Sequence, residues 1–66
     1  MAERMRATIE TDGDRLTDLH LWRLGPGHLG AIVSVATVRT REPDYYRSLL
    51  SRFHALSHLT VQVQRR

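Results

Sequence analysis

The chain has 66 residues, a formal net charge of +3 and no cysteine. A chain of this length forms one domain at most, and such a domain buries only about 60% of the surface that its unfolded chain would expose. Without cysteine it has neither a disulfide nor a thiolate metal site. Partner subunits, or a metal held by histidine and carboxylate, remain as sources of extra stability.

The charge and composition exclude several classes of function. All ten basic residues are arginines, spread from Arg4 to Arg66, whereas nucleic-acid binding needs basic residues concentrated on one face. We therefore expect no nucleic-acid partner. No stretch approaches the roughly 20 apolar residues of a membrane helix, so we expect a soluble domain. The sequence has no cysteine nucleophile and no local Ser-His-acid spacing, so we expect no enzymatic activity.

The first half of the chain predicts a helix followed by a hairpin. In residues 2–10, Met5 and Ile9 lie four apart with charges between them, which is typical of a short amphipathic helix. Gly13 suits a left-handed position that ends it. Residues 15–24 and 28–38 then predict two strands, and the Gly-Pro-Gly turn between them favours an antiparallel hairpin.

The second half predicts another helix and a third strand. Thr40 or Asp44 is a candidate cap for the helix, and Pro43 suits its first turn. An apolar stripe at helical spacing is formed by Tyr46, Leu49, Leu50, Phe53 and Leu56. Residues 57–64 alternate between apolar and polar side chains, as expected of a strand with one covered face.

The order α-β-β-α-β predicts an α+β fold, a two-layer sandwich in which both helices cover one face of a three-stranded sheet. The other face then stays open. It would carry Asp18, His20, Trp22, Thr60, Gln62 and Gln64. A small sheet with one open, partly apolar face tends to pair with a second copy, so we expect a homodimer whose sheets face each other.

The run Asp18-Leu19-His20-Leu21-Trp22 carries the chemistry of the open face. In an extended strand, Asp18, His20 and Trp22 share one face, while Thr17, Leu19 and Leu21 share the other. A carboxylate beside an imidazole on an exposed sheet face indicates either metal-ligand chemistry or a polar patch.

This run, the following Gly25-Pro26 and the closing segment Ser57-His58-Leu59-Thr60-Val61-Gln62-Val63 resemble the cytoplasmic C-terminal domain of cation diffusion facilitators. The resemblance covers nearly the whole chain and implies a ferredoxin-like, metallochaperone-like fold. It implies that residues 1–66 are a single regulatory and dimerisation domain, a fragment of a longer transporter. The domain would lie on the cytoplasmic side of the cell membrane as a homodimer, covalently linked to a transmembrane domain that exports divalent metal of the Zn, Co, Cd or Ni class.

The resemblance also implies a divalent metal ion, Zn or Co, at the dimer interface. The candidate metal ligands are His20, His58, Asp18 and His28, with His54 as a weaker one. Ligand positions of the best-equipped members fall at Thr17, Ser34 and Gln64, which are poor ligands for such an ion. A metal-independent structural dimerisation domain is therefore the main alternative, and a small nucleic-acid-binding module is a third.

Each candidate residue also has a plainer interpretation. His20 could be a polar residue of the dimer interface bonded to Asp18, and His58 could contact backbone or water where its strand begins. Trp22 is expected to anchor the dimer interface rather than stack on a base. The cluster Arg39-Thr40-Arg41 is expected to be a solvated loop, with anionic lipid headgroups as its alternative partner.

Overall fold

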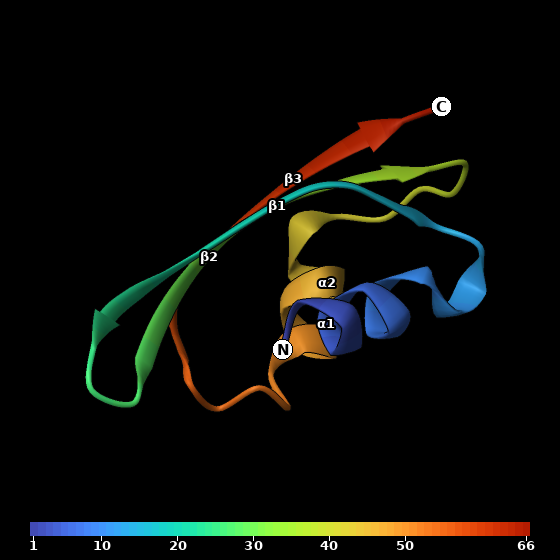
Figure 1. Ribbon diagram of the computed structural model, residues 1–66. Helices are drawn as coiled ribbons and strands as arrows, with labels where there is room; N and C mark the ends of the chain where they lie inside the picture. Colours follow the sequence, from blue (N-terminus) through green and yellow to red (C-terminus); the bar gives the residue numbers. More distant parts are fainter.

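The computed structural model describes all 66 residues and contains two helices over a three-stranded sheet. In chain order the elements are α1 (Ala2–Ile9), a 3₁₀ turn η1 (Glu10–Asp12), β1 (Arg15–Gly25), β2 (His28–Thr37), α2 (Pro43–Leu50) and β3 (Leu56–Arg65). Both helices lie against one face of the sheet, and no element covers the other (Figure 1). The predicted α+β two-layer sandwich is confirmed.

The sheet order is β1-β2-β3, so β2 is the central strand. It pairs antiparallel with β1 through the Pro26-Gly27 turn and parallel with β3. The parallel pairing requires a crossover, which the segment containing α2 supplies. No residue from Leu29 to Val38 is charged, as expected for a strand with neighbours on both sides.

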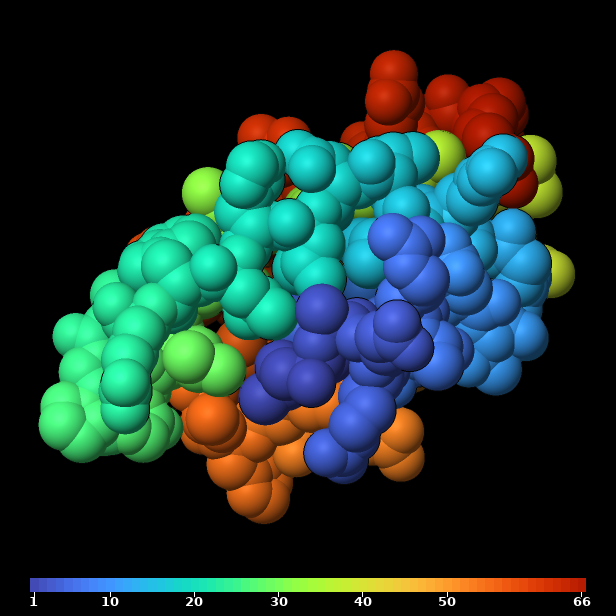
Figure 2. Space-filling view, in the orientation of Figure 1, coloured from blue at the N-terminus to red at the C-terminus, as the bar shows by residue number.

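The core lies between the sheet and the helices. Met5 and Ile9 of α1 and Tyr46 and Leu50 of α2 are at most 1% exposed. They pack on the inward side chains of the sheet, which include Leu16, Ala31, Val33, Val35 and Val61. The β1–β2 hairpin projects beyond the helices, as the green end of the space-filling view shows (Figure 2). The molecule is consequently elongated, 37 Å by 18 Å by 17 Å.

The end of the first helical segment follows the sequence prediction. Gly13 has φ +87° and closes η1 in the left-handed conformation, which glycine adopts without the steric cost of a Cβ. The chain then turns into Asp14, which is only 3% exposed.

The second helix is shorter than its apolar stripe predicted. It ends at Leu50, and residues 51–55 form a turn. Phe53 nevertheless remains buried in the core, and Leu56 begins β3. The helical spacing of the stripe therefore reflected burial on one side rather than a continuous helix. Neither predicted cap is used, because the N-cap is Glu42 and its side chain makes no capping hydrogen bond.

The predicted face of Thr17 is wrong because β1 has a bulge at this residue. Leu16 pairs with Val35 and Asp18 with Ser34, so Thr17 is an extra residue without a partner of its own. It is exposed and donates a hydrogen bond of 3.1 Å from Oγ1 to the Ser34 carbonyl. The bulge lets Leu16 enter the core while Asp18 stays on the open face.

Candidate metal and dimerisation face

The open face of the sheet carries three cross-strand rows of side chains. Strand pairing aligns Asp18 with Ser34 and Gln62, then His20 with Ile32 and Thr60, and then Trp22 with Gly30 and His58. The predicted grouping of Asp18, His20 and Trp22 on one face agrees with this register, and the bulge at Thr17 sets it. Ser34 Oγ donates to Gln62 Oε1 at 3.2 Å within the first row.

Asp18 and His20 form a pair at the surface. The Asp18 Oδ2 and His20 Nε2 atoms are 3.1 Å apart, and Asp18 Oδ1 accepts a hydrogen bond of 3.1 Å from the Leu19 amide. The two side chains are 58% and 66% exposed, so the pair contributes about 0–1 kcal/mol to stability. Its chemical effect is to orient the ring. With Nε2 held by a carboxylate, Nδ1 is the nitrogen left to bind an ion.

Trp22 lies across the central strand because that strand has glycine at the opposing position. A Cβ added to Gly30 would come within 2.6 Å of the Trp22 atoms Cε2 and Cζ2, so any side chain at this position would displace the indole. The indole thus covers Gly30 and approaches His58 of β3, with ring centroids 6.4 Å apart and tilted by 56°. Trp22 remains 37% exposed, as expected of a side chain that a partner could cover.

The four candidate metal ligands do not converge within one chain. His20 on β1 and His58 on β3 are separated by two strand spacings across the sheet and by two residues along the strand. Their backbones are therefore roughly 12 Å apart. His28 Nδ1 lies 2.6 Å from Ser57 Oγ near the start of β3. The structure contains no group of three or more His, Asp or Glu side chains close enough to hold a metal ion. A site built from these residues would therefore need ligands from a second copy.

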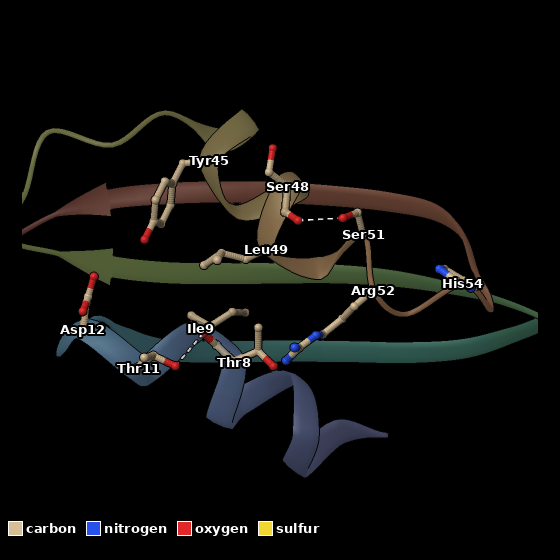
Figure 3. Close-up of a pocket in the computed structure, with 10 residues that line it drawn as sticks. All are labelled: Thr8, Ile9, Thr11, Asp12, Tyr45, Ser48, Leu49, Ser51, Arg52 and His54. Atoms are coloured by element: carbon tan, nitrogen blue, oxygen red, sulfur yellow. Dashed lines mark hydrogen bonds between the residues drawn. The ribbon is translucent and has the colours of Figure 1, made fainter.

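His54 lies away from the open face. It borders a groove of about 590 Å³ between α1 and α2, on the helical side of the sheet (Figure 3). The groove is floored by Ile9 and Leu49. The hydroxyls of Thr8, Thr11 and Ser51 donate to helix carbonyls, so they offer the groove only acceptor lone pairs. His54 belongs to the turn after α2 rather than to the predicted helix.

A buried polar cluster around Asp14 was missed by sequence reasoning. The Asp14 carboxylate accepts hydrogen bonds of 2.6 Å from each of Thr37 Oγ1, Tyr46 Oη and Arg41 Nη1. Burial by itself raises the pKa of Asp14, but these three donors outweigh it and hold the pKa below its ordinary value. Burial and the neighbouring Asp14 charge raise the pKa of Tyr46.

Arg41 is consequently not solvated, contrary to the sequence prediction. Its side chain is 13% exposed, bonds Asp12 through Nη2 at 3.1 Å, and lies over the Tyr45 ring at 4.3 Å. Burial lowers the pKa of Arg41, but the hydrogen bonds to Asp14 and Asp12 raise it above its ordinary value. In the sequence, Asp12 and Asp14 only flank Gly13, the residue predicted to end the first helix, and no local pattern indicates that they pair with Arg41.

These layers and this strand order are those of a metallochaperone-like α+β domain. Among solved structures, the chain is similar to a variant of the C-terminal domain of MamM ("MamM-CTD"), a cytoplasmic domain of the cation diffusion facilitator family. The TM-score is 0.79 at 11% identity, covering 98% of this chain and 92% of that chain. At this identity the match establishes the fold. No family model and no curated protein matches the sequence. Neither helix of the structure is long and apolar enough to cross a membrane.

Proposed function

We propose that this chain is the cytosolic regulatory and dimerisation domain of a cation diffusion facilitator that exports divalent metal. The observation that carries the proposal is the match of 98% of the chain to the MamM C-terminal domain. It agrees with the resemblance of the Asp18–Trp22 run, which was drawn from sequence alone.

The proposed contact is between the open faces of two copies. Trp22 and Ile32 supply apolar surface there, and Asp18, Thr60 and Gln62 supply a polar border. The three rows span roughly 15 Å across the strands and about the same along them. Specific interfaces bury about 800 Å² per partner, so an area this small forms a weak dimer by itself. Attachment of both copies to a membrane domain, or an ion that bridges them, would strengthen it.

In the proposed mechanism, His20 and His58 supply nitrogen ligands from the two copies, with Asp18 orienting His20 and His28 as a further candidate. A Zn²⁺ or Co²⁺ ion takes about four ligands at roughly 2.0–2.2 Å, so binding would fix the relative position of the two sheets. Metal concentration would then be coupled to dimer geometry, because the ion binds one arrangement better than others. This dimer geometry would in turn bias the transporter.

A metal-independent dimerisation domain is the second candidate. Thr17, Ser34 and Gln64 stand where ligands are expected, and no three ligands meet within one chain. The hydroxyls of Thr17 and Ser34 are moreover engaged in hydrogen bonds within the sheet. These observations favour a dimer interface made of ordinary polar and apolar contacts, without a metal ion.

Sedimentation with and without Zn²⁺ tests the proposal and separates the two candidates. We expect a concentration-dependent dimer that Trp22→Ala weakens by at least about 30-fold, since a buried tryptophan anchor contributes 2 kcal/mol or more. Zn²⁺ should tighten the dimer of the unmodified chain and have no effect on His20→Ala or His58→Ala. His54→Ala, on the helical side, is the matched control and should respond like the unmodified chain.

The outcomes assign the function. A dimer that Zn²⁺ does not tighten, with no heat of binding in calorimetry, establishes the metal-independent candidate. A chain that stays monomeric at millimolar concentration, with or without Zn²⁺, contradicts both.

A further inference from the structure

The end of the molecule opposite the hairpin tip carries a hollow surrounded by arginines. It has a volume of about 290 Å³ and is lined by Arg39, Thr40, Arg41, Glu42, Pro43, Val63 and Arg65. The loop after β2, the start of α2 and the end of β3 all contribute to it. Arg66 is close by, since its amide donates to the Thr37 carbonyl at 2.8 Å. Nothing in the proposed dimer uses this end of the fold.

The arginines of the hollow differ in how far they are already paired. Arg41 has one guanidinium nitrogen on Asp14 and another on Asp12, so its orientation is fixed. Arg39 donates one hydrogen bond from Nη2 to the Asp12 carbonyl at 3.2 Å. Arg65 makes no side-chain hydrogen bond or ion pair. Arg39 and Arg65 therefore retain most of their donors, whereas Arg41 is a fixed part of the lining.

The local charge favours an anion. The lining carries three arginines, Arg39, Arg41 and Arg65, against one carboxylate, Glu42. Asp12 and Asp14 lie behind Arg41, which offsets one of their two charges. Two guanidinium groups with free donors match the tetrahedral oxygens of a phosphate group, which they bind by several charge-assisted hydrogen bonds.

We propose that this hollow binds a phosphate group, held by Arg39 and Arg65 against Arg41. The group could belong to a soluble phosphorylated molecule or to an anionic lipid headgroup, because both present the same oxygens. Glu42 opposes binding, so its charge sets the affinity. The site is separate from the open face of the sheet and acts whether or not the domain dimerises.

Titration of the ¹⁵N-labelled 66-residue chain with pyrophosphate, at low ionic strength, tests the soluble source. We expect saturable amide shifts confined to residues 38–42 and 63–66. The double variant Arg39→Gln/Arg65→Gln should weaken binding at least tenfold. The double variant Arg23→Gln/Arg52→Gln removes the same charge from other places on the surface and should leave the affinity unchanged. Glu42→Gln should tighten binding about threefold or more.

Sedimentation with phosphatidylglycerol vesicles, compared with phosphatidylcholine vesicles, tests the lipid source with the same variants. Selective vesicle binding that only Arg39→Gln/Arg65→Gln abolishes supports the proposal and assigns the phosphate to lipid. The proposal is overturned if neither probe binds, or if both double variants weaken binding equally, since the latter indicates nonspecific attraction to net charge. Because these readouts do not involve dimerisation, their failure is distinct from failure of the proposed function.

Discussion

Removing the Asp14 carboxylate should cost this small domain a large part of its stability. Asp14→Ala leaves three donors without their acceptor, namely Thr37, Tyr46 and Arg41. A hydrogen bond to a charged group contributes about 1.5–3 kcal/mol, and breaking a buried pair by deleting one partner costs about 3–5 kcal/mol. Arg41 keeps Asp12 as a partner, so we expect the lower end, about 3 kcal/mol.

A loss of about 3 kcal/mol is large compared with the total free energy of unfolding of such a domain. Domains have about 0.05–0.15 kcal/mol of stability per residue, or roughly 3–10 kcal/mol for this chain. With an m-value of about 1 kcal/mol/M in urea, the midpoint should fall by about 3 M. Urea unfolding followed by circular dichroism, at fixed protein concentration, measures it.

The control is Asp44→Ala, which removes a carboxylate that is 93% exposed and 3.6 Å from Arg47. It should cost less than about 1 kcal/mol. If Asp14→Ala is already unfolded in water, Tyr46→Phe deletes only one of the three donors and should cost about 1.5–3 kcal/mol. Equal midpoints for Asp14→Ala and Asp44→Ala would refute the argument that the buried cluster stabilises the fold.

Three further predictions concern acid stability and two glycines. Because the folded pKa of Asp14 is lowered, its contribution is complete above the unfolded value of about 3.9 and is lost as pH falls through the folded value; acid titration should therefore destabilise the unmodified chain more steeply than Asp14→Asn, and parallel curves would contradict this. Gly30→Val should displace the Trp22 indole, shift its fluorescence emission to the red and cost about 1–3 kcal/mol, and unchanged emission would show that the indole does not lie over Gly30. Gly13→Ala should cost about 1 kcal/mol because φ is +87°, whereas Gly25→Ala, which meets no atom within 4 Å, should cost less in the same thermal melts.

The sequence predicted the element order and the open face because those depend on local periodicity. Alternation placed Asp18, His20 and Trp22 together, and the Gly-Pro-Gly turn fixed the hairpin. What it missed depends on contacts distant along the chain. Ser34 and Gln62 are 28 residues apart and form a hydrogen bond, and Trp22 packs on Gly30. Both contacts depend on strand register, which no local pattern encodes.

The Asp14 cluster was missed for the same reason. Its members come from four separate segments, and each has an ordinary local interpretation: a helix stop, a strand end, a loop arginine and a core tyrosine. Only the fold brings them together. The candidate metal ligands differ from this cluster. The local pattern identified His20 and His58, but the fold of a single chain does not bring them together.

The uncharged central strand makes β3 a protective element. Residues 29–38 contain no charge and are rich in β-branched side chains, which is the composition of segments that assemble into fibrils. β3 covers one edge of that strand along nine paired positions, from Leu29 to Thr37. Shortening the chain before β3 would leave that edge open to strands of other molecules. Aggregation, rather than simple loss of binding, is therefore the expected fate of such a truncated chain.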